Sequence, residues 1–401
     1  MGRGRMKKSS LNHRIAAVLI CAAAIAGIMT GCGGMQSIKQ DTTLKSDDSA
    51  ETAAENSTES TTEAATEEVT EPTEELVNFD YTLSFAGDIC YEDGGYTTSY
   101  WQNCGKDTSM CFDSVMMDHM QNADVFFINN EFQFSRRGTP TAGKEFTFRS
   151  DPDNVQLLKD IGADIVSLAN NHSYDYGEEA LLDTFDTLDN AGIPYVGAGK
   201  DLEEASSTYY YELDGFKVAY VSSTRVELYE LTKGATETEP GVFRTVDEDQ
   251  VNFLYDKVRE AKENADFVVV YIHWGDEFVT YIDEFQTNTG DALIDAGADV
   301  VMGDHPHCLQ GIKYHNGKPI LYSLGNYWFR ACNGDTMLAE LHVKGNRENF
   351  ETELQLVPAV LSNCQVNYIS NEYEQSAFYQ RMIDMSFGID IDENGVVTDA
   401  S

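Results

Sequence analysis

The fold of this chain is decided by the stretch Ser167-Leu-Ala-Asn-Asn-His-Ser-Tyr-Asp-Tyr-Gly177. Its first residues continue an apolar run, residues 164–168, that predicts a buried β-strand. Residues 177–191 then place Leu181, Leu182, Phe185 and Leu188 on one face of a predicted helix. A strand that ends in polar residues and leads into a helix is the repeating unit of an α/β fold.

Apolar strands alternate with helical patterns through most of the chain. Strands are predicted at residues 81–86, 125–128, 164–168, 216–221, 267–272, 299–302, 320–324 and 351–357. Helices are predicted from Asp151-Pro152 to about residue 162, and at residues 177–191, 247–264 and 285–296. This alternation predicts one α/β domain, residues 79–370, whose helices cover a largely buried sheet. Residues 371–401 are predicted to form a C-terminal extension.

Polar side chains follow five of these strand segments, at the point where each apolar run ends. They are Asp88, Glu131, Asn171, His172, His273, His305 and His307. In open α/β sheets, the loops beyond the carboxyl ends of the strands form the binding crevice. Carboxylates and imidazoles together suit borderline divalent ions such as zinc, manganese or iron. Singly, each residue is as expected in an ordinary turn, but four of the eight histidines fall in these loops. The sequence therefore predicts a metal site.

The N-terminus indicates export. Residues 1–14 carry five Lys or Arg, and an uncharged apolar run follows from residue 15 to 29. That layout is typical of a secretory signal peptide, predicted at residues 1–31. Met29-Thr30-Gly31-Cys32 resembles the lipobox of bacterial lipoproteins, which implies lipidation of Cys32. An ordinary cleaved signal and an uncleaved anchor are the alternatives.

A segment rich in Thr, Ser, Ala and Glu follows, residues 32–78. It has 12 Asp or Glu against 2 Lys and almost no large apolar residues. Such a composition buries too little apolar surface to offset chain entropy, so it predicts a disordered, acidic tether. Removing the charges of the leader and the tether from the total of −41 leaves −36 for residues 79–401. That charge argues against nucleic acid or an anionic membrane surface as a partner.

Six cysteines remain after Cys21 and Cys32, and no spacing dictates their pairing. Cys104 and Cys111 are the nearest pair, and free thiols are an equal alternative. Lys144 and Arg149 lie near Glu131 in the sequence, where they could meet an anionic substrate or lie on the solvated surface.

The motifs resemble, in order, the blocks of the CapA family, whose members act in poly-γ-glutamate capsule synthesis. Residues 167–177 look like its Asn-Asn-His…Asp-x-Gly signature. The other blocks are Phe85-Ala-Gly-Asp88, Asn130-Glu131, residues 192–199, His273-Trp-Gly275, His305-Pro-His307 and Ser323-Leu-Gly-Asn326. The resemblance covers residues 81–357. It implies the four-layer sandwich of calcineurin-like metallophosphoesterases: two sheets flanked by helices, with two adjacent metals.

The resemblance also implies a role for each site residue. Asp88 and His307 resemble ligands of one metal, and Glu131 sits at the bridging position. Asn171, His273 and His305 resemble ligands of the second metal. His172 resembles the histidine that protonates the leaving group, with Asp175 to orient it.

Two residues depart from the superfamily pattern. Cys90 stands where relatives carry histidine, so the first metal is weak, absent or assisted by the Cys90 thiolate. Glu131 stands where they carry the shorter aspartate.

Such a site supports metal-assisted hydrolysis of a phosphate ester, although amide hydrolysis is also chemically feasible. The resemblance implies a lipid-anchored protein on the extracellular face of the bacterial cytoplasmic membrane. There it would act on an anionic polymer or phosphoester, beside membrane-bound capsule synthesis proteins. One alternative is a non-catalytic, metal-containing scaffold or polymer-binding component of capsule export. Another is a solute-binding lipoprotein, which does not account for the histidines.

Overall fold

The computed structural model describes residues 77–226, 231–330 and 332–401. The predicted signal peptide, Cys32 and all but the last two residues of the predicted tether lie outside these ranges. Within them, every helix is too short or too polar to cross a bilayer.

The larger of two main sheets has ten strands, eight of them in one continuous order. That order is β19 (Ile389–Ile391), β20 (Val396–Asp399), β17 (Asn349–Ser362), β16 (Gly334–Asn346), β1 (Phe79–Cys90), β2 (Val125–Asn130), β5 (Ile165–Ser167) and β6 (Tyr195–Val196). In addition, β15 (Asn326–Phe329) pairs with β1, and β18 (Gln365–Tyr368) pairs with β17. The strands β1, β2, β5 and β6 are parallel, so their carboxyl ends meet at one edge.

The second main sheet has six strands. Their order is β13 (Ile312–His315), β14 (Lys318–Leu321), β12 (Val300–Asp304), β11 (Phe267–His273), β9 (Phe216–Thr224) and β8 (Tyr209–Leu213). The central strands β9, β11, β12 and β14 are parallel. Two short pairs lie apart: β3 (Gln133–Phe134) with β4 (Arg149–Ser150), and β7 (Ala198–Gly199) with β10 (Gly241–Val242).

The two main sheets pack face to face through an apolar core. The Phe127 ring of β2 lies 5.5 Å from Tyr220 of β9 and 4.8 Å from Tyr271 of β11, between centroids. Side chains alternate between the faces of a strand, so Phe126 and Ile128 point to the other side of the larger sheet. Each central strand is therefore apolar on both faces, which is why its sequence reads as an unbroken hydrophobic run.

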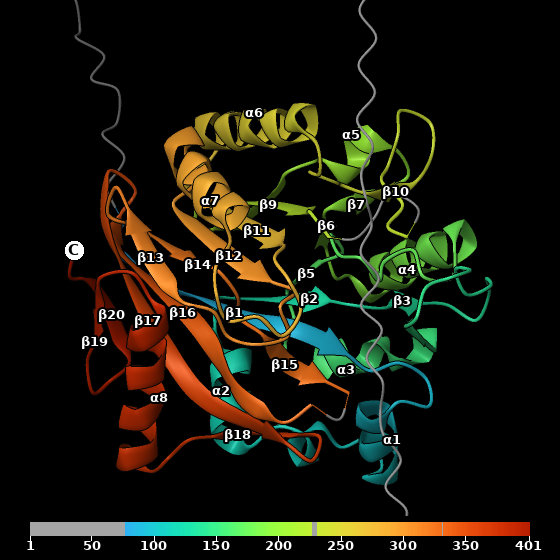
Figure 1. Cartoon of the computed structure of the whole chain (residues 1–401), viewed down its shortest axis with the longest axis horizontal. Coiled ribbons are helices and arrows are strands. Elements are labelled where there is room, and N and C mark those ends of the chain that lie inside the picture. The colour runs from blue at the N-terminus through green and yellow to red at the C-terminus, as the bar shows by residue number, and fades with distance from the viewer. Residues whose placement is uncertain (1–76, 227–230, 331) are drawn as a thin grey trace, which may run out of the picture. The chain divides into compact units, whose positions relative to one another are not determined.

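Helices cover the outer face of each main sheet. Those on the larger sheet are α2 (Ser114–Asn122), α3 (Gln156–Asp160) and α4 (Glu178–Ala191). Those on the smaller sheet are α6 (Glu248–Asn264) and α7 (Glu284–Ala296), seen side by side in Figure 1. Asp247 and Asp283 begin these two with capping boxes. The predicted four-layer sandwich is confirmed.

The segment predicted as an extension takes part in the sheet. Its helix, α8 (Glu372–Met385), packs beside β19, and β20 pairs with β17 (Figure 1). The domain limit at residue 370 remains a prediction. The remaining described helices are α1 (Tyr96–Asn103), α5 (Leu202–Ala205) and two 3-10 turns, Thr108–Met110 and Pro152–Val155.

Local details differ from the sequence predictions in two places. The helix expected from Pro152 begins as a 3-10 turn, Pro152–Val155, and becomes α-helical only in α3. The strand expected at residues 320–324 is shifted to β14, and the residues after it turn back toward β12. All six cysteines in the described ranges are free, including Cys104 and Cys111.

Replacing Phe127 tests the contact between the sheets. Because its ring is fully buried between Tyr220 and Tyr271, Phe127→Ala should lower the free energy of unfolding by about 3–5 kcal/mol. Urea unfolding followed by circular dichroism measures the change. Tyr373→Ala is the matched control, since that ring is 82% exposed. Equal stability of both variants would contradict the proposed packing.

Candidate metal centre

The predicted site residues meet where the carboxyl ends of five strands from both main sheets converge. Asp88 lies in β1, Glu131 follows β2, and the turn holding Asn171 and His172 follows β5. From the smaller sheet, His273 ends β11, and the loop after β12 carries His305 and His307. All of these residues are buried except His307, which is slightly exposed. The structure therefore brings every predicted ligand to one place.

A bulge in β1 sets the position of Asp88. The pairing with β2 shifts register between Phe85 and Asp88, which re-aims the side chains that follow. At Gly87 a Cβ atom would lie 2.0 Å from the carbonyl oxygen of Gly325, so only glycine allows this approach. The Asp88 amide donates to that same oxygen at 2.9 Å.

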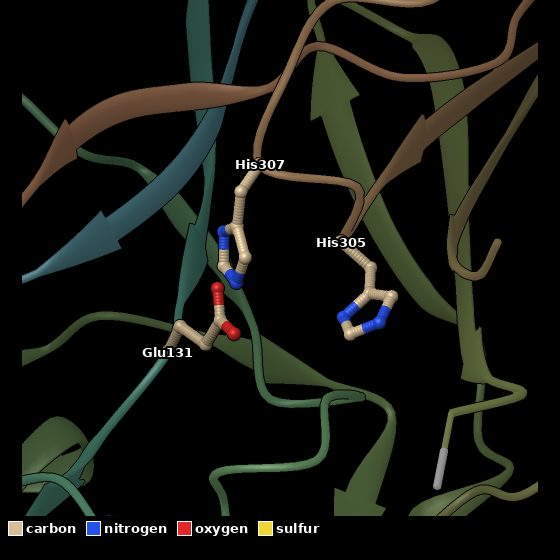
Figure 2. Close-up of side chains that lie close together, drawn as sticks. All are labelled: Glu131, His305 and His307. Atoms are coloured by element: carbon tan, nitrogen blue, oxygen red, sulfur yellow. The ribbon is translucent and has the colours of Figure 1, made fainter. Parts of the chain in front are cut away.

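Glu131, His305 and His307 form the first candidate group of ligands. One ligand atom from each lies within 4.8 Å of the others, and Figure 2 shows the Glu131 carboxylate directed toward the His307 ring. Asp88 adjoins this group, because its Oδ2 lies 3.1 Å from His307 Nδ1. The pair predicted for one metal, Asp88 and His307, is thus in direct contact.

The second candidate group is Asp88, His273 and Asp304. His273 Nδ1 donates to Asp304 Oδ1 at 2.8 Å, which leaves the lone pair of His273 on Nε2. That Nε2 lies 2.8 Å from Asn171 Oδ1 and 3.1 Å from His305 Nδ1. The three residues predicted for the second metal therefore converge on one point.

The donor set fits a cation. His273 Nε2 and the amide oxygen of Asn171 both present lone pairs at the convergence point, and a cation relieves their repulsion. Glu131 Oε1 and Asp304 Oδ2 are buried with no hydrogen-bond partner among the described residues. Buried carboxylate oxygens without partners are costly unless they are protonated or bind a metal.

Shifted pKa values report the same excess of buried negative charge. Burial, together with the charges of Asp88 and Asp304, raises the pKa of Glu131. Burial and the charge of Asp88 likewise raise the pKa of Asp304. Burial alone would raise the pKa of Asp88, but its hydrogen bond and charge interaction with His307 lower it overall.

Two of the histidines are held neutral, the form that binds metals. Burial and the neighbouring His307 charge lower the pKa of His305 to about 3. Burial, then the charge of His305, lowers the pKa of His273 well below its usual value.

Two further residues hold the centre together and were missed from the sequence. Asp304 fixes the His273 ring, and it lies inside Gly303-Asp-His-Pro-His307, directly before a predicted ligand. Asn129 Nδ2 donates to Asp88 Oδ1 at 3.0 Å, and its Oδ1 accepts from Asn170 Nδ2 at 2.9 Å. Alternation along β2 could have found Asn129, since it places residues 127, 129 and 131 on one face.

His172 stands apart from the ligand groups and is braced from behind. Its Nδ1 donates to Asp175 Oδ2 at 2.7 Å, and Asp175 Oδ1 forms an ion pair with Lys144 Nζ at 2.9 Å. His172 Nε2 consequently faces Glu131 Oε1, 3.8 Å away. Lys144 also donates to the backbone oxygen of Asn171. The Lys144 side chain is therefore buried and supports Asp175, which differs from both roles considered from the sequence, a solvated surface residue and a substrate contact. The guanidinium of Arg149 lies over the Tyr176 ring.

Cys90 does not join the ligand groups found among the described residues. Its Sγ is buried and donates to Glu92 Oε2 at 3.4 Å. Burial and the charges of Glu92 and Glu131 raise the pKa of the Cys90 thiol well above its usual value. The structure therefore favours a protonated thiol over the thiolate ligand considered from the sequence.

Residues 82–331 match the family described as bacterial capsule synthesis protein PGA_cap. The chain belongs to the PGA_cap family. This family, which includes the CapA proteins, lies within the metallophosphoesterase-like superfamily, in agreement with the sandwich and the donor set.

Two curated proteins show how the PGA_cap chain relates to its family. It is 27% identical over 322 residues to the capsule biosynthesis protein CapA of Bacillus anthracis, covering 78% of this chain and 75% of that one. It is 35% identical over 213 residues to the PGA biosynthesis protein CapA of Bacillus subtilis (strain 168). That second match spans 51% of this chain and about half of the relative, 53%. The crystal structure of a hypothetical protein from Thermus thermophilus aligns with 69% of this chain and 99% of its own, at 16% identity and a TM-score of 0.39.

Asn129 and Cys90 offer a matched pair of substitutions at the centre. Asn129→Ala removes the hydrogen bond that orients Asp88, so metal affinity should fall about 10–100-fold. Cys90→Ala, equally buried in the neighbouring strand, should leave affinity unchanged because its thiol faces Glu92. Titration with Mn²⁺ followed by calorimetry measures both. A loss in the Cys90 variant alone would restore the thiolate-ligand hypothesis.

Proposed function

We propose that this protein is a metal-dependent hydrolase of the phosphoesterase type that acts in the synthesis, release or attachment of a capsular polymer. The observation that carries the proposal is the position of His172. Its ring is braced by Asp175 through Nδ1, and its Nε2 faces Glu131 Oε1 at 3.8 Å, beside the candidate ligands. A scaffold needs ligands alone, whereas a proton donor held beside them serves bond cleavage.

The residues present would hold two divalent cations. Asp88, Glu131 and His307 would hold one, and Asn171, His273 and His305 would hold the other. Bound divalent cations supply Lewis-acid chemistry: they acidify water and neutralise negative charge on the transferred group. Because the Cys90 thiol faces Glu92, the donors are carboxylate, amide and imidazole groups, a mixed set that suits Mn, Zn or Fe.

The chain's own residues would manage the proton. His172 would hold a proton on Nε2 and donate it to the leaving group. The carboxylate of Asp175 stabilises the charged ring and fixes its orientation through Nδ1. The buried ammonium of Lys144 pairs with Asp175 and ties it to the Asn171 turn. These contacts support the proposal that the acid and one ligand share a single turn.

The family supports the biological setting of this chemistry. The relatives' names point to capsule biosynthesis, and we propose that the polymer is of the poly-γ-glutamate type. We further propose that the protein is anchored by lipidated Cys32 on the extracellular face of the membrane and held off it by residues 32–78. Membrane-bound capsule synthesis proteins would then be its neighbours.

Replacing His172 separates a hydrolase from a scaffold. His172→Ala should lower kcat for bis(p-nitrophenyl) phosphate with Mn²⁺ by about 10²–10⁴-fold, because the proton donor is lost while the ligands stay. Metal content by mass spectrometry should be unchanged. His315→Ala is the control, since its ring pairs with Asp295 outside the centre.

The opposite result supports the other class of function. If the wild-type protein binds metal and shows no turnover, and His172→Ala retains capsule formation in cells, a non-catalytic scaffold or polymer-binding role replaces the hydrolase.

Replacing Cys32 tests the proposed lipid anchor. Cys32→Ala should abolish labelling by radioactive palmitate and release the protein from the membrane fraction, because the lipid carries most of the binding energy of such an anchor. Cys21→Ala serves as the control within the same leader. A Cys32→Ala protein that stays membrane-bound would contradict the lipobox.

A further inference from the structure

A pocket of about 370 Å³ opens beside the metal centre, and His172 and His307 both line it. Most of its remaining wall is aromatic: Tyr96, Phe146, Phe148, Phe278 and Phe329. Three of these rings, Tyr96, Phe146 and Phe278, are exposed at 66%, 47% and 70%, which is unusual for large apolar side chains. The pocket thus offers apolar surface to a substrate held at the centre.

One cation, Arg330, lines this aromatic pocket. Each of the other eight arginines in the described ranges donates a hydrogen bond from its guanidinium. Arg330 donates none there, and its one ion pair joins Nε to Glu92 Oε1 at a loose 3.5 Å. Its two terminal amino groups are therefore available in a pocket where the side chain is 34% exposed.

Ring contacts hold the guanidinium at a fixed place relative to the site. Its central carbon lies 5.0 Å from the Phe146 ring and 5.3 Å from the Phe148 ring. Phe148 in turn packs on His172, with centroids 4.2 Å apart. The preceding residue, Phe329, packs on His307 at 4.6 Å. Arg330 is thus one ring away from both histidines of the site.

The backbone at Arg330 adds to this arrangement. Its φ of 48° lies in the left-handed region, which non-glycine residues seldom adopt. Such strain is concentrated at sites where a side chain must be placed for function. Here it turns the end of the β15 strand so that an arginine follows Phe329 into the pocket.

We propose that Arg330 and its aromatic pocket form a subsite for an oxyanion that the substrate carries beside the bond to be cleaved, either a carboxylate or a phosphate. The proposal rests on the hydrolase function proposed above. A planar guanidinium matches both oxyanions with paired hydrogen bonds. The surrounding rings contact the carbon skeleton between the oxyanion and the reacting group. The substrate class is accordingly a compound in which an apolar carbon skeleton joins an oxyanion to the bond that is cleaved.

Calorimetric titration of the full-length protein with two oligomers tests the subsite. Hexa-γ-glutamate presents carboxylates, and a hexamer of glycerol phosphate presents phosphates. Arg330→Gln should weaken binding of at least one oligomer about 10–100-fold, as expected when hydrogen bonds to a charged group are lost. The oligomer that responds identifies the oxyanion. Arg330→Lys should retain part of the affinity, because it keeps the charge without the planar fork.

The matched control is Arg259→Gln on α6, whose guanidinium pairs with Asp256 on the surface. It should bind both oligomers like the wild type. The proposal is overturned if the wild type binds neither oligomer, or if Arg330→Gln binds both as tightly as the wild type does. It is also overturned if Arg330→Gln weakens binding of a fully amidated hexa-γ-glutamate as much as it weakens binding of the acidic one.

Turnover of bis(p-nitrophenyl) phosphate, which lacks a second acidic group, separates this subsite from the hydrolase itself. Arg330→Gln should leave the metal content unchanged, because Arg330 is not among the candidate ligands. Arg330-dependent binding without any turnover in the wild type would retain the subsite and reject the hydrolase. Turnover with binding that ignores Arg330 would reject the subsite alone.

Discussion

Buried negative charge is the constraint on which the rest of this structure depends. Asp88, Glu131 and Asp304 are fully buried where the two sheets meet, and one oxygen of each has no hydrogen-bond partner among the described residues. Isolated buried carboxylates are too costly for a fold to keep unless a proton or a cation compensates them. The raised pKa values of Glu131 and Asp304 favour compensation by a proton. The lone pairs of His273 and Asn171, which face each other, favour compensation by a cation.

The need to compensate this buried charge accounts for the separate roles of the polar residues: some are candidate ligands, and others orient those ligands. Ligands come from both sheets, so the apolar core between the sheets also fixes the distances across the centre. Asn129 and Asp304 orient ligands from behind through hydrogen bonds of 3.0 and 2.8 Å. His172 has its own brace, Asp175, and therefore does not compete for the same partners. A site held in this way keeps its geometry through changes at the surface.

The central strands, the covering helices and the position of the site could be predicted from local patterns in the sequence, whereas the four-layer sandwich was implied only by the resemblance to the CapA family. Apolar runs mark the central strands, and polar residues at their ends mark the crevice. The motif before α4, residues 167–177, together with the other blocks of the family resemblance, implied which residues are ligands. Alternation along β2 places Asn129 on the same face as Glu131, but the roles of Asn129 and Asp304 could not be assigned, since the side chains they contact are distant in sequence. The bulge at Gly87 is equally hidden, because it depends on the approach of Gly325. Arg330 could not be identified from the sequence either. It differs from the other arginines of the described ranges in donating no hydrogen bond from its guanidinium to the described residues, and only the structure shows this.

The acidity of the domain bears on how it could handle an acidic polymer. With a charge of −36 outside the leader and tether, the surface repels such a chain at long range, although salt screens this repulsion beyond about 8 Å. Attraction must then come from cations at close range. The metal centre supplies one set, and Arg330, at the mouth of the same pocket, supplies another. Under the proposed hydrolase function, a polymer would be held only where both are reached together, so the repulsive surface would favour release of product and confine binding to the proposed site of cleavage.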